Sequence, residues 1–303
     1  MSADRPEHDG RPGSADRPEH GGRPGSADRP ETADRPETGD RPETGPFGIT
    51  GKGPGLYDQI GRTYAGTRHP DPRIAAAIWD ALGDARTVLN VGAGAGNYEP
   101  VDREVVALEP SEVMIAQRPP AAAPVVRGRA EELPFEDGSF DAVMAVLSDH
   151  HWTDRRQGFA ELLRVARRLV VLFNANPGEA DLFWLTTEYL PEFLELIPAR
   201  YRRRETWKDE LRSVLRSVDL VPVPIPHDCT DGFYGAYWRR PEAYLDPAVR
   251  AGISVFAQLS STAVDRAIGA LRADLDTGRW RDRHPGLLTK DDLHLGYYVV
   301  VGK

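Results

Sequence analysis

Apolar residues along most of this chain recur either at helical spacing or in short unbroken runs. The helical spacing over residues 71–83 predicts a helix with Asp71 as its N-cap and Gly83 at its end. Short runs bounded by glycine or polar residues predict buried strands at 87–91, 105–108, 140–147 and 169–173. Helices are expected between the strands, after Ser111 and around Leu162. This alternation predicts a parallel sheet covered by helices on both faces.

The later part of the chain places longer segments between its strands. Residues 181–201 are rich in Leu and Phe and are expected to be helical. The run LVPVPIP, residues 220–226, predicts a strand that lies near an edge or ends early, because proline cannot donate to the ladder. The run LGYYVVVG, residues 295–302, predicts a closing strand. An antiparallel closing strand would complete seven, so the expected fold class is α/β with a mostly parallel seven-stranded sheet.

The first residues of the chain repeat a short polar unit. SADRPEHDGRPG (2–13) recurs as SADRPEHGGRPG (14–25) and then decays into DRPET units. These units contain no large apolar residue to bury, and their prolines favour extended backbone, so residues 1–46 are expected to form a disordered tail. The remaining residues, 47–303, are expected to form one domain with helical cap insertions. Its predicted parts are a core at 57–177, caps at 178–219 and 227–293, and a closing strand at 295–302.

Charge and composition narrow the choice of partners. The formal net charge is −9, of which the first 45 residues contribute −4 (seven Arg against eleven Asp and Glu) and the rest −5. The densest basic run, Arg200 to Arg204, is followed by acidic residues, so no basic face for nucleic acid is expected. No stretch approaches the roughly 20 apolar residues of a membrane span. The single Cys229 suits a reducing compartment, so we expect a cytoplasmic protein with a small-molecule partner. The oligomeric state stays open.

A glycine-rich loop follows the first predicted strand. Glycines at positions 92, 94 and 96 alternate with alanines, which lets the backbone approach a ligand closely because no Cβ intervenes. A loop at a strand-to-helix junction also presents backbone N–H groups. Glu109 ends the second strand, where a carboxylate can accept both hydroxyls of a ribose. A dinucleotide fingerprint would need glycine at position 97, which is Asn97, so the pattern favours a different nucleoside-containing cofactor.

The segment that leads into the 140–147 strand carries a family resemblance. GRAEELPFEDGSFDAVMAVLSDHHW, residues 128–152, resembles the third and fourth motifs of class I S-adenosylmethionine-dependent methyltransferases, in particular the type 11 group. The resemblance extends from about Tyr57 to Arg168, and residues 227–245 resemble an actinobacterial set of type 11 proteins. It implies a Rossmann-like seven-stranded methyltransferase sheet, S-adenosyl-L-methionine as cofactor, and methyl transfer to a small molecule. Secondary metabolism is one setting for such an enzyme.

The resemblance also implies which residues contact the cofactor. They are Asn90, Gly92, Ala93, Gly94, Gly96, Glu109, Pro110, Met114, Arg129, Ala130, Glu131 and Leu147. The glycines would lie against the methionyl and ribose parts, Glu109 on the ribose, and Ala130 and Glu131 near the adenine. Arg129 departs from the family, which commonly has Asp there to bind the adenine amino group. Glu131, Glu132 or a backbone carbonyl is the alternative partner for that group.

A segment upstream of the first helix resembles the part of the family that folds over the cofactor. It reads YDQIGRTYAGTR, residues 57–68. Tyr64 would then pack on the ligand, and Arg68 would pair with its carboxylate through a charge-assisted hydrogen bond. The alternative is a Tyr that packs on the first helix and an Arg that faces solvent.

Residues 148–152 follow the fourth strand at the carboxyl edge of the sheet, where the sites of open α/β sheets lie. Methyl transfer is an in-line displacement on an already activated sulfonium, so the protein mainly aligns the two reactants. Where the nucleophile must lose a proton, His150 or His151 is the natural base because histidine titrates near neutral pH. The alternative is that these histidines cap or pack locally.

Two further stretches are candidates for substrate or metal contacts. The first contains Tyr234, Tyr237, Trp238 and Arg239. Aromatic rings with a cation could wall a small substrate, or these residues could belong to a helix packed on the core. In the second stretch, His227 and Cys229 could join the paired histidines as metal ligands. The alternative is a polar loop with a buried cysteine, and no bound metal is expected.

Several functions are compatible with these patterns. A small-molecule methyltransferase accounts for the ordered motifs and the long insertions together. A protein that binds the cofactor without catalysis, and a metal-assisted C-methyltransferase for a 2-oxo acid, are the alternatives. A nicotinamide oxidoreductase is a third alternative, although it lacks the glycine at position 97.

Overall fold

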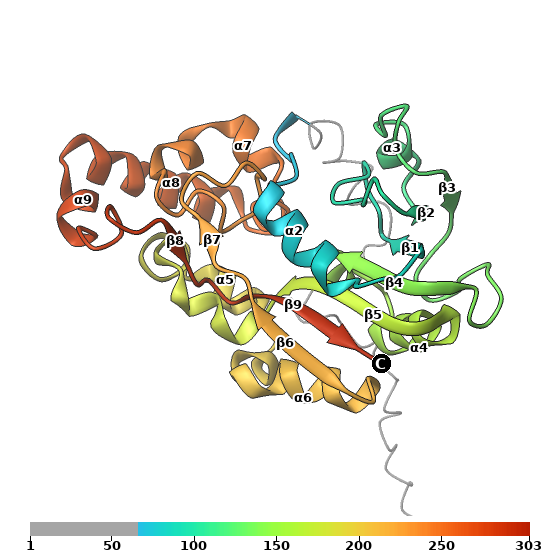
Figure 1. Cartoon of the computed structure of the whole chain (residues 1–303). Coiled ribbons are helices and arrows are strands. Elements are labelled where there is room, and N and C mark those ends of the chain that lie inside the picture. The colour runs from blue at the N-terminus through green and yellow to red at the C-terminus, as the bar shows by residue number, and fades with distance from the viewer. Residues whose placement is uncertain (1–65) are drawn as a thin grey trace, which may run out of the picture. The chain divides into compact units, whose positions relative to one another are not determined.

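The computed structural model of the protein describes residues 66–303, which lie within the second of two units of the chain, Arg41–Lys303. Seven strands form one sheet in the order β3-β2-β1-β4-β5-β9-β6 (Figure 1). The strands are β1 (Thr87–Val91), β2 (Glu104–Glu109), β3 (Val125–Arg127), β4 (Phe140–Val146), β5 (Ala166–Ala175), β6 (Val218–Pro222) and β9 (Tyr297–Gly302). The predicted tail and Tyr64 lie outside the described residues.

The pairing of the strands agrees with the predicted fold class. The pairs among β1 to β5 are all parallel, with Val88 of β1 aligned to Val105 of β2 and Ala142 of β4. The last strand, β9, is antiparallel to both of its neighbours, β5 and β6. The prediction of a mostly parallel seven-stranded sheet with an antiparallel closing strand is therefore confirmed.

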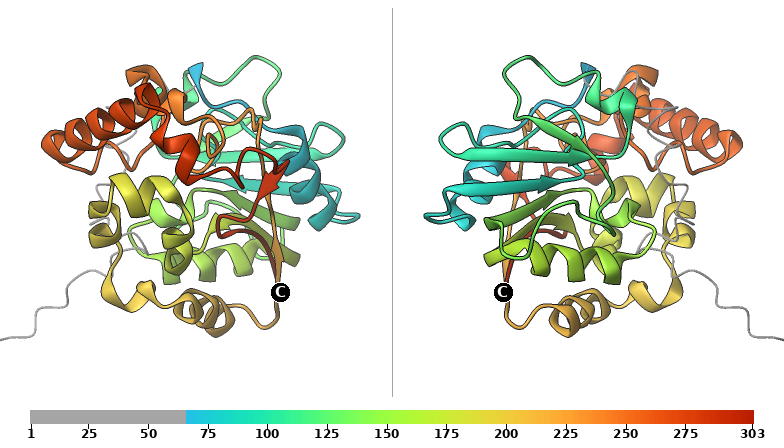
Figure 2. Two further views of the ribbon diagram at one scale, coloured as in Figure 1. Left: turned by 90° about the vertical axis from the view of Figure 1, so that its left-hand side faces the viewer. Right: turned by 90° about the vertical axis from the view of Figure 1, so that its right-hand side faces the viewer.

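Side chains that alternate along the strands build two separate cores, one on each face of the sheet. Val88 packs with α2 (Pro72–Ala81), whereas Leu89 packs on the opposite face with α4 (Arg155–Val165) and α6 (Arg204–Val214). In Figure 1, α2 lies above the sheet and α4 and α6 lie below it, and Figure 2 shows the same layers from two sides. Both faces are covered because a parallel sheet must bury both sides. Each fully buried apolar side chain contributes roughly 1.5–3 kcal/mol to this arrangement.

The helix starts follow the local sequence. The Asp71 side chain accepts from the backbone N–H of Arg73 as the N-cap of α2, and Pro72 occupies the first helical position. Ser111 caps the short α3 (Glu112–Ile115) by accepting from the N–H of Met114 at 3.3 Å. Both caps agree with the helix starts predicted from the sequence.

Prolines interrupt two later segments, and for residues 220–226 this confirms the predicted strand that lies at an edge and ends early. The 181–201 segment consists of short turns of helix, and Pro191 and Pro198 directly precede two of them. These turns are η3 (Pro177–Leu182), η4 (Leu185–Tyr189), α5 (Glu192–Leu196) and η5 (Ala199–Arg202). The 220–226 strand ends at Pro222 on the sheet edge, because a proline lacks the N–H that a ladder needs. A separate pair, β7 (Ile225–Pro226) and β8 (Asp292–Leu293), follows.

The long segment between β7 and β8 folds into helices whose buried residues belong to the same core as α2. They are η6 (Pro241–Leu245), α7 (Pro247–Ala251), α8 (Ser261–Asp276) and α9 (Arg279–Arg283). Buried aromatic residues of this segment and of the 177–202 segment join the core on the α2 face, among them Phe183, Trp184, Phe233, Trp238, Tyr244 and Trp280. The two insertions therefore share one core with the sheet.

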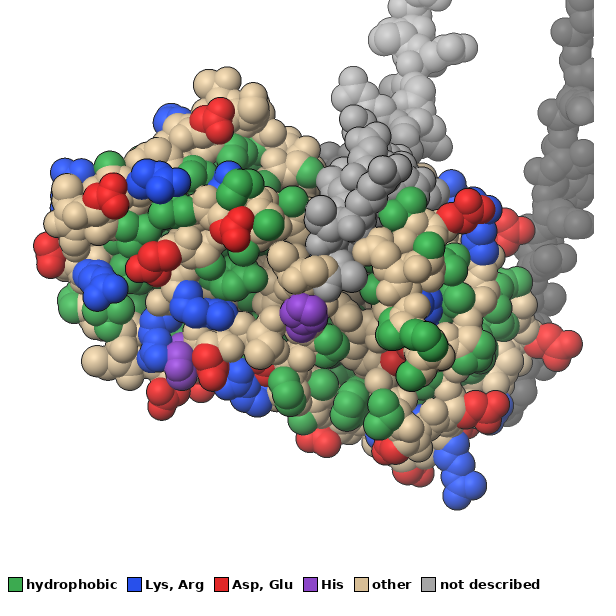
Figure 3. All heavy atoms as spheres, turned by 90° about the horizontal axis from the view of Figure 1, so that it is seen from above, with side chains coloured by type: hydrophobic (Ala, Val, Ile, Leu, Met, Phe, Trp, Pro, Cys, Tyr) green, Lys and Arg blue, Asp and Glu red, His purple; other side chains and the backbone are tan. Residues whose placement is uncertain are grey.

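One face of the described part is mixed in charge (Figure 3). In the view of Figure 3, basic and acidic side chains are interspersed over the described residues of that face. Within residues 66–303, no helix has the length and the apolar composition that crossing a bilayer requires.

Candidate active site

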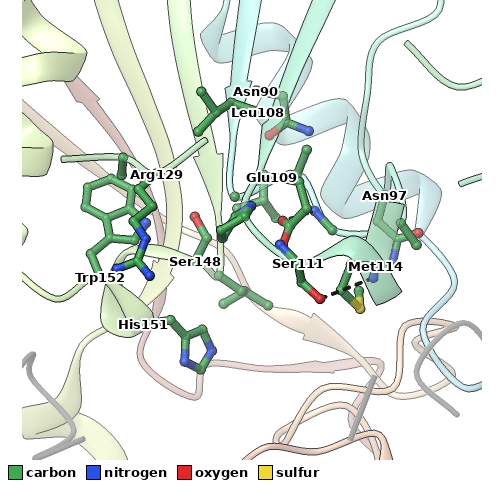
Figure 4. A pocket seen from close by; sticks show the side chains of 18 of the residues that line it. Asn90, Asn97, Leu108, Glu109, Ser111, Met114, Arg129, Ser148, His151 and Trp152 are labelled. Carbon is green, nitrogen blue, oxygen red and sulfur yellow. Dashed lines mark hydrogen bonds between the residues drawn. The ribbon is translucent and has the colours of Figure 1, made fainter. Parts of the chain in front are cut away.

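A cavity opens where β1, β2 and β4 end, and we call it the glycine-loop cavity. It is lined by Arg68, Asn90, Gly92, Ala93, Gly94, Ala95, Asn97, Tyr98, Leu108, Glu109, Pro110, Ser111, Met114, Arg129, Ala130, Glu131, Val146, Leu147, Ser148, His151, Trp152 and Thr153. Figure 4 shows Arg129 and Trp152 on one side, Met114 and Asn97 on the other, and Glu109 and Ser111 between them. Of the predicted cofactor contacts among the described residues, only Gly96 is absent from this lining, and Tyr64 lies outside the described residues.

The loop after β1 needs glycine for its backbone conformation. Gly92 and Gly94 have φ angles of +69° and +53°, in the left-handed region that favours glycine. A Cβ on Gly92 would lie 2.6 Å from the Cβ of Ser148, which follows β4. The loop can therefore pass closely beside the end of β4 only because residue 92 has no side chain.

The Glu109 carboxylate holds this loop in place. It accepts hydrogen bonds from the backbone N–H of Gly94 at 2.8 Å and from that of Ser111 at 3.0 Å. A carboxylate offers about four acceptor sites, so the same group can serve both the backbone and a diol. The side chain is buried at the carboxyl end of β2, which is the position expected for a ribose acceptor.

A buried ion pair supports the glycine loop from beneath. Arg118 pairs with Glu99 at 2.8 Å, and another of its nitrogens donates to the carbonyl of Gly94 at 3.2 Å. Glu99 also accepts from the side chain of Asn90 at 3.3 Å. Both charged groups are almost fully buried, so loss of either would leave an unpaired buried charge. The pair therefore fixes the position of the loop at Gly94.

The adenine end of the cavity differs from the family pattern. Arg129 extends beside Trp152 in Figure 4, at the position where the family commonly has Asp. The Glu131 carboxylate accepts from the backbone N–H of Thr153 at 2.6 Å and from that of Asp154 at 3.1 Å. Glu131 therefore joins the 128–132 segment to the start of α4 while lining the cavity.

A tight turn carries the paired histidines at the end of β4. Leu147 has a φ of +49°, which is strained for a residue with a branched side chain, and η2 (Asp149–His151) follows it. The imidazole rings of His150 and His151 lie 3.8 Å apart. Burial lowers the pKa of His150 to about 3 and lowers the pKa of His151 well below its usual value. Both imidazoles are therefore neutral at pH 7.

A buried polar network holds this turn in place. Asp149 accepts from the Arg155 guanidinium at 2.6 Å and also from the amide nitrogen of Asn174 at the end of β5. Arg155 reaches on to Glu210 of α6, also at 2.6 Å. The network thus fixes the histidine turn to the adjacent strand and to both helices of the lower layer.

A second cavity lies beyond the histidine turn, and we call it the aromatic cavity. It is lined by Arg68, Leu147, His150, Asn174, Ala175, Asn176, Pro177, Ala180, Phe183, Phe193, Phe233, Tyr234, Gly235, Gly252, Ile253, Ser254, Val255, Leu295 and Tyr297. Five of these residues are aromatic and come from the two insertions and from β9. Such a cavity, mostly apolar with a few polar groups, is typical of a small-molecule site.

Two residues, Arg68 and Leu147, line both cavities. The histidines divide between them, because His151 lines the glycine-loop cavity and His150 lines the aromatic cavity. The two cavities therefore meet at the end of β4.

The Arg68 side chain is held by a buried acid from the second insertion. Its Nε donates to Asp231 Oδ1 at 2.5 Å and its Nη2 donates to Oδ2 at 3.2 Å. The hydroxyl of Tyr98 also donates to Asp231, at 2.8 Å. The alternative in which Arg68 faces solvent is wrong, since the side chain is buried. The proposed pairing with a cofactor carboxylate would have to share the guanidinium with Asp231.

Three of the four predicted substrate contacts lie away from the aromatic cavity. Only Tyr234 lines it. Trp238 is fully buried in the core and donates to the carbonyl of Ile225 at 2.8 Å, whereas Arg239 is bound to the carbonyl of Lys290 at 2.6 Å. The ring of Tyr237 stacks on the Arg240 guanidinium. Successive side chains of residues 234–239 point in different directions, so neighbours in the sequence do not line the same cavity.

The proposed metal ligands do not form a site. Among residues 66–303, no group of three or more His, Cys, Asp or Glu side chains is placed to hold a metal ion. The Cys229 thiol donates to the carbonyl of Asp231, and burial raises the pKa of this thiol to about 12. His227 contacts the carbonyl of Asp291 at 3.1 Å. The interpretation as a polar loop with a buried cysteine fits this geometry.

Several residues of the site were not expected from the sequence. Asp231, Tyr98 and Arg118 act from outside the motifs, and Tyr297 and Ile253 reach the aromatic cavity from segments far along the chain. The apolar ones carry no signal beyond hydrophobicity. The only signal for Asp231 in the sequence is that an acidic residue follows His227 and Cys229 closely. That stretch was interpreted as a possible metal site instead.

Comparison with known proteins agrees with this geometry. A family model described as a methyltransferase domain matches residues 89–173. A protein of Anabaena variabilis described as a methyltransferase from an antibiotic biosynthesis pathway is similar in structure, with a TM-score of 0.69. It is 31% identical, and the match covers 78% of this chain and 99% of that one.

Two curated relatives match a smaller part of the chain. The uncharacterized protein YafE of Escherichia coli is 31% identical over 49% of this chain and 69% of its own length. A demethylmenaquinone methyltransferase of Beutenbergia cavernae is 34% identical over 46% of this chain and 65% of its own length. The chain thus spans about two thirds of the length of these relatives.

Proposed function

Because the chain belongs to the type 11 group of class I S-adenosylmethionine-dependent methyltransferases, we propose that it methylates a small molecule held in the aromatic cavity. The cofactor would occupy the glycine-loop cavity. The observation that carries this proposal is that the two cavities meet at Leu147 and Arg68, so a methyl group at the junction faces an acceptor. A protein that only binds the cofactor would have no use for a second cavity at that point.

The residues present fit S-adenosylmethionine. Glu109 would accept the ribose hydroxyls, and the loop at Gly92 and Gly94 would lie against the methionyl part, because these residues line the glycine-loop cavity. Met114 and Leu108 offer an apolar wall for the adenine ring. Arg129 and Trp152 close the opposite side, where a planar guanidinium and an indole can stack on a base.

The residues at the junction align and shield the reaction. The bound cofactor supplies a methyl group activated on a sulfonium, so positioning is the main task. The aromatic walls exclude water from the acceptor. His150 is neutral and lines the acceptor cavity, so it can accept a hydrogen bond from an acceptor hydroxyl and take its proton. Its low pKa makes it a weak base, which favours an orienting role over strong proton abstraction.

We assign the two insertions, 178–219 and 227–293, to a cap over the acceptor. Phe183 and Phe193 of the first and Phe233 and Tyr234 of the second line the same cavity. Helix α6 is different, because it packs on the lower face of the sheet as an ordinary crossover. The cap would thus be built from the remainder of the insertions, and the core for the cofactor, proposed at 57–177, would include the described residues 66–177.

The relative from an antibiotic biosynthesis pathway supports a small-molecule acceptor, and secondary metabolism is the setting we propose. The mixed charge of the face in Figure 3 gives no support to a nucleic-acid partner there. A single buried cysteine suits the cytoplasm, where we expect the enzyme to act.

Two measurements test the proposal. Calorimetric titration with S-adenosylmethionine should show one site per chain. Incubation of an extract of small metabolites with methyl-labelled cofactor should then yield a labelled low-molecular-weight product. Cofactor binding without any labelled product would favour a non-catalytic protein, and no cofactor binding would contradict the proposal altogether.

A further inference from the structure

The walls of the aromatic cavity contain almost no charge. Among the described residues that line it there is no Asp, Glu or Lys, and Arg68 is the single residue with a permanent charge. His150 is neutral because it is buried. An ammonium group on an acceptor would therefore find no carboxylate among the described residues of this wall, and burying an unpaired charge is costly.

The charge of Arg68 is neutralised within the protein. Asp231 is fully buried and binds the guanidinium through both of its oxygens, at 2.5 and 3.2 Å. Tyr98 donates to the same carboxylate and so fixes its orientation. A carboxylate on an acceptor would have to compete with Asp231 for the guanidinium, and would bring a second negative charge close to it.

We propose that the aromatic cavity takes an uncharged, planar aromatic acceptor, and that Asp231 is the residue that sets this specificity by neutralising Arg68. The five aromatic rings of the wall supply the contacts for a flat ring system. Neighbouring rings in the wall meet edge to face, as Phe193 and Tyr234 do with centroids 4.9 Å apart. This inference rests on the proposed function, because it assigns the acceptor of that same reaction.

Three probes of one shape test the charge selectivity of the natural protein. They are 2-naphthol, 2-naphthoate and 2-naphthylmethylammonium, each titrated at pH 7 into protein saturated with S-adenosylhomocysteine. The naphthol should bind at least about tenfold more tightly than either charged probe. Equal affinity for naphthoate or for the ammonium, or no binding by any of the three, would overturn the inference.

The Asp231→Asn variant tests the origin of the selectivity. It keeps the shape of the side chain and an oxygen for Tyr98, but it removes the charge that neutralises Arg68. The ratio of naphthoate to naphthol affinity should rise at least about tenfold, since the guanidinium can then pair with the probe. The matched control is Asp228→Asn, an exposed acid of the same segment paired with Arg73, which should leave the ratio unchanged.

A double variant keeps the test decisive if Asp231→Asn is unstable. Arg68→Gln with Asp231→Asn removes both charges and should restore the preference for naphthol. An unchanged ratio in a folded Asp231→Asn variant, or a naphthoate preference in the double variant, contradicts the role of Asp231. Titration with S-adenosylhomocysteine alone separates failure of the proposed function from failure of the inferred selectivity. If S-adenosylhomocysteine does not bind the natural protein, the proposed function fails. If it binds, the three probes decide the selectivity.

Discussion

The two cavities that meet at Leu147 are built in different ways. Among the described residues, the glycine-loop cavity is formed, apart from Arg68, by residues 90–153, and Glu109 is joined to the glycine loop through the backbone N–H of Gly94. The aromatic cavity is formed by side chains from residue 68 to residue 297, most of them apolar. A backbone-built site tolerates few sequences, whereas a wall of aromatic side chains can change one residue at a time. The first therefore suits a constant cofactor and the second a variable acceptor.

The largest effect is expected from a side chain placed into the glycine loop. Gly94→Val should weaken S-adenosylhomocysteine binding by at least about 100-fold. Residue 94 has a φ of +53°, where a branched side chain costs about 1–3 kcal/mol, and the new methyl groups meet Met114. Titration calorimetry measures the change. Gly269→Ala in α8, where a Cβ meets nothing within 4 Å, is the control and should bind normally.

The next largest effect on cofactor affinity is expected from Glu109, the acid that binds the glycine loop. Glu109→Ala should weaken cofactor binding by roughly 1.5–3 kcal/mol, the scale of hydrogen bonds to a charged group. Glu112→Ala removes a nearby but exposed carboxylate and should change nothing. Equal losses in both variants would mean that general charge, rather than the geometry of Glu109, holds the cofactor.

A smaller effect is expected in the acceptor half. Phe193→Leu should raise the KM of the acceptor by about 2–12-fold, since the aromatic pair that Phe193 would form with the acceptor ring contributes about 0.5–1.5 kcal/mol beyond its buried area. Cofactor affinity should stay the same, because Phe193 lines only the aromatic cavity. The control is Tyr237→Phe, since Tyr237 lines neither cavity, and it should alter neither the KM nor the cofactor affinity. A loss of cofactor binding in Phe193→Leu would show that the two cavities are not separable.

The histidine turn should be visible in the pH dependence of stability. The pKa values of both histidines are lower in the folded state than in the unfolded chain, so the unfolded state binds more protons below pH 6.5. Their contribution is therefore fully present above about pH 6.5 and is lost as the pH falls toward 3. The Tm should drop between pH 7 and pH 5, and less so in His150→Gln. An identical drop in that variant would mean that other groups cause it.

The smallest effect is expected from the repeated N-terminal segment. Deletion of residues 2–45 should leave the Tm and the turnover unchanged, because the deleted residues contain no large apolar side chain to bury. Thermal denaturation and the labelled-methyl assay check this directly. A fall in either would assign the repeats a part in the fold or in the reaction.

The sequence was most informative where local rules decide the structure. Asp71 and Ser111 cap helices as predicted, and the runs around Val88 and Val143 form central strands of the sheet. The glycine loop and Glu109 could be placed because both follow directly from strand ends. Hydrophobic periodicity and helix caps predict these features because each one depends on neighbours within a few residues.

The acceptor half could not be predicted in the same way. Trp238 and Arg239 were predicted to contact the substrate, yet Trp238 packs in the core and Arg239 is half-buried and bound to the carbonyl of Lys290. Tyr297 reaches the cavity from the closing strand, where its spacing only indicates burial. Asp231 pairs with a residue 163 positions away, and no local rule connects them. These contacts depend on tertiary packing of the insertions.

The most direct test of the account is a crystal structure of the protein with S-adenosylhomocysteine. We predict that the ribose hydroxyls contact Glu109, that the base lies between Met114 and Trp152, and that the sulfur lies at Leu147 facing the aromatic cavity. A nucleoside bound elsewhere, or a sulfur that faces away from the aromatic cavity, would contradict the claim that these two cavities together form the methyl-transfer site.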